Sequence, residues 1–422
     1  MLTVLAVVSD AIAPSIGGRG FPWVAGISSW CAAVVLWPSL SAGLRVAALA
    51  LIALGTAIGL LSGLDWLVFL EQALSRNAGI LCMLIAVGFL RLVPIAAGRR
   101  PQRRGTAAWR DTLLATAVFG SVINISALLI IADYLRARGG GRAFALESLT
   151  RVFTASAAWS PFFAGMAVVI EYVPGATVSA LMAASLPYAL VAMLFTWAWG
   201  RFRRVDETQH FEGFPLALSA LMLPLVLAVL VVCAFVLQPA LPIVVMIALS
   251  ALTACFGFLA FAKGAQHAFR EMAEHVVTGL ANGVNELVLF LAAGVLAVGL
   301  AALFDSGQVQ LPNAPYDWVF ASLALAAMLF FAVLGVHPVV SVTGLAPALL
   351  ALSPPPVLLA LTFLFAWSLG TSVSPLSATL LTVQGRYGLA GWRVACANAP
   401  FAAALFVVAV ASFYVVDVNG IG

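Results

Sequence analysis

The sequence predicts an all-α polytopic membrane protein with two inverted repeats, each holding a re-entrant helical hairpin and a broken transmembrane helix. Three observations predict this fold. Of the 422 residues, 64% are hydrophobic and only 9% are charged, whereas a soluble domain carries roughly 25% charged residues. Apolar runs long enough to cross a bilayer recur along the whole chain. Two of these runs are interrupted, at matching places in the two halves.

The uninterrupted apolar runs have the length of about 20 residues that a helix needs to cross a hydrocarbon core. They are 22–40, 43–62, 78–96, 152–172, 178–199, 213–236, 240–262, 280–303, 356–382 and 394–416. The first 18 residues lack a basic start and are too short to span, so we expect neither a signal peptide nor a spanning helix there. Such a segment could lie at the membrane interface.

Charge and cysteine usage exclude several classes of protein. The net charge is +4, but the basic residues stand in short clusters between apolar runs, where they orient helices, so we expect no nucleic-acid partner. The five cysteines lie inside apolar stretches without CxxC spacing, so we expect no disulfide and no metal site. Without an HExxH motif or a Gly-rich phosphate loop, we expect no catalytic residues and no enzyme.

The interrupted runs are 112–134 and 318–350. The first has basic flanks on both sides, which by the positive-inside rule are both cytoplasmic, so the run enters and returns. The second is flanked by 304–317 and 351–355, which hold no Lys or Arg, so it enters and returns from the outside. The basic residues that flank the first run are Arg99, Arg100, Arg103, Arg104, Arg110, Arg136, Arg138 and Arg142.

The other basic residues fit the same topology. Arg45, Lys263, Arg270, Arg386 and the Arg201-Phe202-Arg203-Arg204 cluster fall inside, and only Arg19 and Arg76 fall outside. We therefore expect a multi-pass inner-membrane protein with both termini in the periplasm.

Landmarks with matched spacing indicate an internal repeat. Ser160-Pro161 follows Gly120 by 40 residues, and Pro187 lies 26 beyond Pro161. Ser374-Pro375 follows Gly335 by 39 residues, and Pro400 lies 25 beyond Pro375. We expect a first repeat at 1–200 (hairpin 112–134, broken helix 152–172), a cytoplasmic linker at 201–212, and a second repeat at 213–422 (hairpin 318–350, broken helix 356–382).

Inverted repeats with broken helices are typical of secondary transporters. Backbone groups cannot remain unpaired in lipid, so a broken helix survives where it lines a cavity or binds a solute. The half-helix N-termini present free N–H groups to an anion, and the freed carbonyls at the other ends can coordinate a cation.

The breaks also resemble a known family. Ser121-Val122-Ile123-Asn124-Ile125-Ser126 and His337-Pro338-Val339-Val340-Ser341-Val342-Thr343 look like its hairpin tips, although the second tip has no Asn. Thr154-Ala155-Ser156-Ala157-Ala158-Trp159-Ser160-Pro161 and Gly370-Thr371-Ser372-Val373-Ser374-Pro375 are similar to its unwound helices. This pattern resembles the ion transporter superfamily, in particular divalent anion/sodium symporters and the large subunits of TRAP transporters. The resemblance implies a homodimer, a fixed scaffold with a moving substrate domain, and an interfacial arm helix at 263–277.

The candidate substrate-binding residues are the hydroxyl and amide side chains at the tips and breaks. They are Ser121, Asn124, Ser126, Ser160, Ser341, Thr343, Thr371, Ser372 and Ser374. The residues expected to break the helices are Gly120, Gly335, Gly370, Pro161 and Pro375. The alternative is that the small polar residues mediate close helix packing and that the prolines only kink their helices.

Three residues are candidates for ion coupling: Asn124, His337 and Glu286. His337 could carry a coupling proton, because the ordinary pKa of histidine lies in the useful range. The alternative role is that of a neutral hydrogen-bonding residue at the tip. Glu286 begins a long apolar helix, and an acid inside the membrane is a functional candidate. The alternative is that Glu286 lies at the cytoplasmic interface and stays ionised.

The sequence therefore favours cation-coupled transport of a small organic anion by elevator-like alternating access. H⁺ is preferred over Na⁺ because of His337 and the missing second Asn, and no other cofactor is expected. One alternative is an exporter of an amphiphilic or toxic solute, which the apolar tip residues Ile123, Ile125 and Val340 would suit. The other is a membrane-embedded enzyme acting on lipid-linked substrates, which would need Glu286 and His337 for its chemistry.

Overall fold

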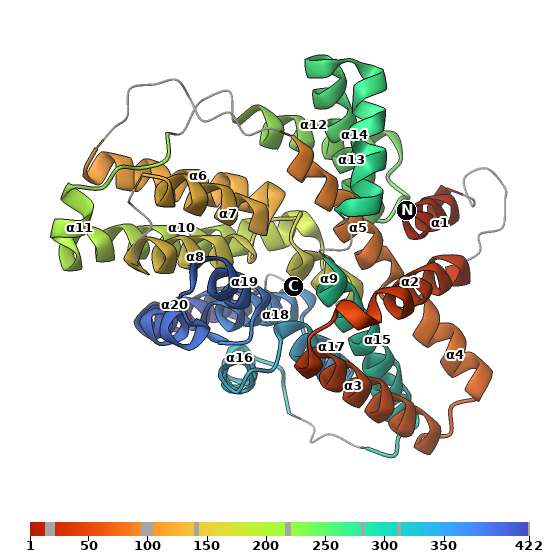
Figure 1. Cartoon of the computed structure of the whole chain (residues 1–422). Coiled ribbons are helices and arrows are strands. Elements are labelled where there is room, and N and C mark those ends of the chain that lie inside the picture. Colours follow the sequence, from red (N-terminus) through yellow and green to blue (C-terminus); the bar gives the residue numbers. More distant parts are fainter. Residues whose placement is uncertain are drawn as a thin grey trace. The chain divides into compact units, whose positions relative to one another are not determined.

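The computed structural model describes residues 1–12, 22–93, 104–138, 143–215, 221–279, 283–309 and 314–420 (Figure 1). These residues are helical apart from their connections and an isolated bridge between Arg104 and Glu212. Five arginines of the predicted topology, Arg19, Arg99, Arg100, Arg103 and Arg142, lie outside the described residues.

The chain forms two compact units that do not coincide with its sequence halves. Unit 1 comprises Met1–Pro94, Leu225–Asn313 and Thr343–Leu352. Unit 2 comprises Ile95–Pro224, Ala314–Val342 and Ser353–Gly422. Each unit takes segments from both 1–200 and 213–422, so the units do not test the predicted repeat, which stays a prediction.

Unit 1 consists of the early helices and the middle of the chain. Its elements are α1 (Leu2–Ile12), α2 (Pro22–Leu36), η2 (Trp37–Ser39), α3 (Ala42–Leu61), α4 (Trp66–Ser75), α5 (Ala78–Gly88), η3 (Phe89–Leu92), most of α12 (Met222–Leu237), α13 (Ile243–Lys263), α14 (Ala265–Thr278), α15 (Val284–Asp305) and part of α17 (Pro338–Leu350). The helices α3 and α15 pack tightly because glycine faces glycine, and a Cβ on Gly299 would overlap the carbonyl of Gly55. Small residues allow such close approach of membrane helices.

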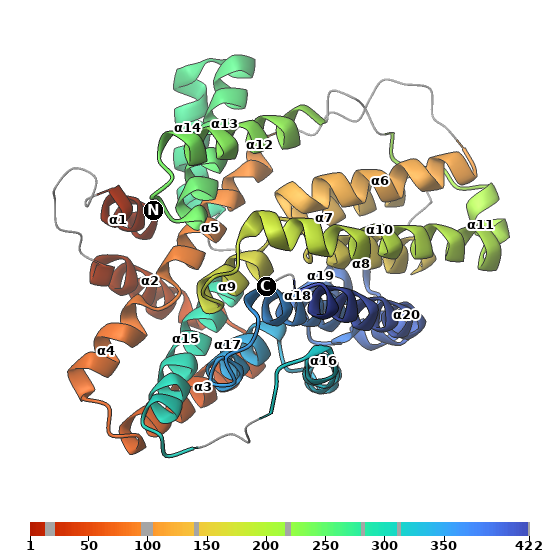
Figure 2. The same cartoon turned by 180° about the vertical axis from the view of Figure 1, so that it is seen from behind.

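Unit 2 is built around α18 (Figure 2). Its other helices are α6 (Thr106–Ile123), α7 (Ile125–Arg136), α8 (Ala143–Ser156), α9 (Ala164–Tyr172), α10 (Val178–Arg203), α11 (Val205–Gln209), α16 (Trp318–Val333), α19 (Ala378–Tyr387) and α20 (Gly391–Val418). α18 (Pro356–Val373) is buried along nearly its whole length and packs against α16, α20, α8 and α9. A helix that is apolar all round belongs in such a central position.

Seven helical stretches of the described chain are long and apolar enough to cross a membrane. They are 42–61, 66–92, 178–203, 243–263, 284–305, 356–387 and 391–418. One of them includes α4, where the sequence analysis placed no helix. Its start is fixed by Asp65, whose carboxylate accepts from the N–H groups of Leu67 at 2.9 Å and Val68 at 3.2 Å, as an N-cap residue does.

The two interrupted runs differ in structure. α6 and α7 meet at Asn124 and pack on each other as a helical hairpin (Figure 1). The chain between α16 and α17 turns at Gly335, which has a φ of 97°, and α16 makes its main contacts within unit 2 with α18 and α20. The expectation that both runs are re-entrant hairpins stays a prediction.

Candidate functional site

The first helix break lies between α8 and α9 and includes Ser160-Pro161. The Ser160 hydroxyl donates to the Ser121 carbonyl on α6 and accepts from the Phe162 N–H at 3.2 Å. The Asn124 amide nitrogen donates to the Phe162 carbonyl at 3.0 Å. The structure therefore brings the first tip and the first break together, joined by hydrogen bonds.

Asn124 has an unusual backbone. Its φ is 52° and its ψ is −140°, a combination that glycine adopts readily and other residues rarely do. Of the other first-tip candidates, Ser121 donates its hydroxyl to the Val118 carbonyl, and Ser126 is half-buried. Gly120 lies against the ring of Phe153, because a Cβ there would be 3.2 Å from a ring carbon.

The second helix break lies between α18 and α19. Thr371 and Ser372 donate to carbonyls of their own helix, each at 2.7 Å, and Ser377 caps α19. Ser374 differs from these residues because its hydroxyl is fully buried and has no hydrogen-bond partner in the part of the chain that the structure describes. An unpaired buried hydroxyl costs free energy, which makes this atom a candidate ligand contact.

His337 precedes α17 and has a local role. Its Nδ1 accepts from the Val339 N–H at 3.1 Å, and its ring meets the Trp367 ring edge-on with centroids 5.8 Å apart. These contacts correspond to the alternative in which His337 is a neutral hydrogen-bonding residue. Nearby, Gly370 lies against Pro338, because its Cβ would be 3.2 Å from a ring carbon of that proline.

The sequence analysis missed Arg151 and Asn398, which link the two breaks. Arg151 on α8 is only 2% exposed. Its Nε donates to the Asn398 Oδ1 at 2.8 Å, and its Nη2 donates to the Ala397 carbonyl at 2.6 Å. Asn398 on α20 in turn donates to the Ser372 carbonyl at 3.0 Å. The available signal was its place in the sequence, because Arg151 stands directly before the apolar run 152–172, and a charge at the edge of a membrane segment can be functional.

The remaining candidates are distributed between the units. Ser341 belongs to unit 2 and is buried, whereas Thr343 belongs to unit 1. Glu286 also belongs to unit 1, where it lines a pocket with Arg91 and His275. Unit 2, which holds both breaks, therefore does not include Glu286. Among the described residues no group of three His, Cys, Asp or Glu side chains could hold a metal ion.

No protein-family model matches the chain, and no curated protein sequence matches it. Among solved structures, the chain is similar to the crystal structure of the Alcanivorax borkumensis YdaH transporter, reported to have an unusual topology. The TM-score is 0.34 and the identity is 15%, over 93% of this chain and 88% of that chain. A similarity of this size does not define a shared fold. The apolar helices of the chain themselves define its class, a multi-pass helical membrane protein.

Proposed function

We propose that the chain is a secondary active transporter of a small organic anion, coupled to H⁺ or Na⁺. The observation that carries this proposal is the buried hydroxyl of Ser374 at the break between α18 and α19, which has no hydrogen-bond partner among the described residues. A hydroxyl can donate to an anion or offer its lone pairs to a cation. The carbonyls of Thr371 and Ser372 at the end of α18 already accept hydrogen bonds from Ser377 and Asn398, so the Ser374 hydroxyl is the group that this break offers to a ligand.

The first break supports the same proposal. Asn124 keeps a backbone conformation that glycine would adopt at less cost, and strain of this kind concentrates at functional sites. Its amide already holds the break through the Phe162 carbonyl. The free N–H groups at the start of α7 lie directly after Asn124, so this end suits an anionic group.

The chemistry of the breaks favours binding over catalysis. Residues 157–163 and 374–377 contain hydroxyl, apolar and aromatic side chains, and no Asp, Glu, Lys or His.

Proton coupling through His337 would have to break the hydrogen bond that Nδ1 accepts from the Val339 N–H, so the geometry gives H⁺ no advantage over Na⁺ as the coupling ion. We further propose that one of the two compact units moves relative to the other in an elevator-like cycle. The proposed protein is a homodimer in the inner membrane.

The test is charge movement on a solid-supported membrane carrying the reconstituted full chain. Pulses of mono-, di- and tricarboxylates are given with a sodium step or a pH step. We expect one carboxylate class to elicit a current that Ser374→Ala and Asn124→Gly abolish. The matched control is Ser185→Ala, because Ser185 is equally buried in unit 2 but its hydroxyl is bonded to the Leu181 carbonyl at 2.6 Å.

The outcomes separate the possibilities. A current that survives Ser374→Ala would contradict the assigned site. A current that follows sodium and ignores pH would identify Na⁺ as the coupling ion, and the reverse would identify H⁺. Silence across the carboxylate panel, with folded protein in the membrane, would contradict an electrogenic organic-anion transporter.

A further inference from the structure

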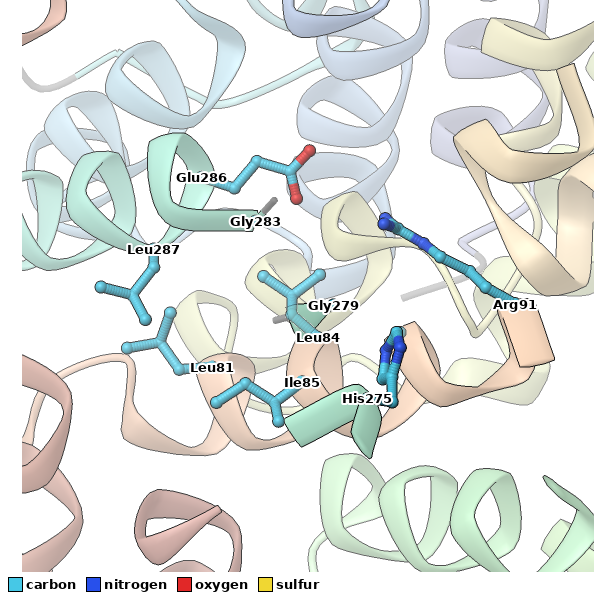
Figure 3. Close-up of a pocket in the computed structure, with 10 residues that line it drawn as sticks. Leu81, Leu84, Ile85, Arg91, His275, Gly279, Gly283, Glu286 and Leu287 are labelled. Atoms are coloured by element: carbon cyan, nitrogen blue, oxygen red, sulfur yellow. The ribbon is translucent and has the colours of Figure 1, made fainter. Parts of the chain in front are cut away.

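Unit 1 holds a pocket that is lined by both a basic and an acidic side chain. Its residues are far in the sequence from the two helix breaks. Arg91 from η3, His275 from α14 and Glu286 from α15 line its polar part, and Leu81, Leu84 and Leu287 line its apolar part (Figure 3). The empty volume is about 510 Å³, including space open to solvent.

Two glycines create this space. A Cβ on Gly279 would overlap the ring of His275, so only glycine allows the imidazole to lie where it does. A Cβ on Gly283 would meet no atom within 4 Å. Glu286 follows in the first turn of α15, where the helix dipole stabilises a carboxylate. The local sequence therefore places a carboxyl group beside an open space.

The charged groups approach the pocket from different elements. Figure 3 shows the Arg91 guanidinium and the Glu286 carboxylate both pointing into the space above Leu84. Among the described residues there is no direct ion pair between them. A ligand with two opposite charges can therefore satisfy both groups, with an anionic oxygen on Arg91 and a cationic nitrogen on Glu286.

His275 adds a second acceptor for the cationic group. Its ring is held against Phe89, with centroids 5.0 Å apart, and is hydrogen-bonded to the Gly88 backbone. Burial and, next in size, the neighbouring Arg91 lower the pKa of His275 below its ordinary value, so the ring is neutral at pH 7. A neutral imidazole that donates one N–H to a carbonyl keeps its other nitrogen as an acceptor.

The position of the pocket along the helices indicates its depth in the bilayer. It lies where the apolar stretch 66–92 ends and the stretch 284–305 begins. Because both stretches are candidate membrane spans, a pocket at their ends lies at the level of lipid headgroups. The helix α14, which supplies His275, packs back along α13 (Figure 1), and its Phe269 and Val277 are 73% and 80% exposed.

We propose that this pocket binds the headgroup of a zwitterionic phospholipid. The phosphate lies on Arg91, the ammonium lies between Glu286 and His275, and an acyl chain runs along Leu81, Leu84 and Leu287. This site is independent of the transport site in unit 2. It also gives Glu286 a role other than ion coupling.

The test is native mass spectrometry of the purified full chain in detergent, titrated with palmitoyl-oleoyl phosphatidylethanolamine or phosphatidylglycerol. We expect phosphatidylethanolamine to bind about tenfold more tightly, because only its ammonium can pair with the carboxylate. Glu286→Gln should remove this preference, Arg91→Gln should weaken both lipids, and Gly283→Leu should block both by filling the space. Asp305→Asn at the other end of α15 and Arg270→Gln on α14 are the controls and should change neither.

Three results would overturn the proposal. One is equal binding of the two lipids by the parent chain, and another is an unchanged preference in a folded Glu286→Gln variant. The third is equally tight binding of glycerophosphoethanolamine, which has the headgroup without acyl chains, because the site would then take a soluble solute. Persistence of transport current in Glu286→Gln with loss of the lipid preference would support two independent sites.

Discussion

At the residue scale, the backbone of Asn124 can be tested apart from its side chain. Asn124→Gly removes strain of about 1–3 kcal/mol and loses one hydrogen bond of about 1 kcal/mol, which Asn124 donates to Phe162. Asn124→Ala loses the same bond and keeps the strain. We expect the glycine variant to be the more stable of the two by at least about 1 kcal/mol in detergent unfolding titrations. Equal unfolding free energies would show that φ is not positive at this residue.

The residue with the largest expected effect on stability is Arg151. Arg151→Gln removes the donors that satisfy the Asn398 Oδ1 and the Ala397 carbonyl, both deep in unit 2. Breaking a buried charged network costs about 3 kcal/mol or more, so we expect a loss of that size in the free energy of unfolding in detergent.

The control for Arg151 is Arg110→Gln on α6. The Arg110 side chain is 54% exposed and pairs with Asp111 at 2.9 Å, so we expect a change of about 0.5 kcal/mol or less. Similar losses in the two variants would mean that Arg151 is more accessible to water than its burial indicates.

At the element scale, α14 should respond to acid. Glu271 accepts from the Lys263 ammonium at 2.9 Å and lies 3.1 Å from the His267 ring nitrogen. The bond from Lys263 holds the pKa of Glu271 below its usual value of 4.5. Because the folded pKa is depressed, the stabilisation is present above the unfolded pKa and is lost as the pH falls through the folded value.

Hydrogen exchange measures this effect. After correction for intrinsic rates, the amides of α14 should lose protection as the pH falls below about 4.5. In Glu271→Gln this acid step should be absent. The control is Glu274→Gln. Glu274 lies in the same helix and forms no side-chain ion pair among the described residues, so the acid step should remain in this variant. An unchanged step in Glu271→Gln would assign the acid response to another group.

At the scale of the whole molecule, the topology remains a prediction that labelling can test. In a cysteine-free background, a cysteine at His210 should react with an impermeant maleimide only after the membrane is opened. A cysteine at Gln308 should react in intact cells, because its loop holds no Lys or Arg and an outside loop is expected to lack them. The opposite pattern would reverse the orientation.

The sequence by itself located the breaks. Near Ser160-Pro161 and Ser374-Pro375 the helices α8 and α18 end within a few residues of the prolines, because proline removes a backbone donor and restricts the residue before it. Asn124 falls where the hairpin turns. These are local effects of the backbone, and residues a few positions apart are enough to produce them. The bounds of some apolar spans were also close, as with 43–62 against the observed 42–61, but α4 was missed.

Only the tertiary structure decided which groups meet. Arg151 and Asn398 are 247 residues apart in the chain, and no local pattern pairs them. The packing of α18 against α8 and the assignment of Glu286 to a pocket with Arg91 and His275 are equally non-local. Ser374 looked like Thr371 and Ser372 in the sequence, and only its surroundings left its hydroxyl without a partner among the described residues. Such differences depend on burial and on packing between distant segments, which the order of residues along one chain does not display.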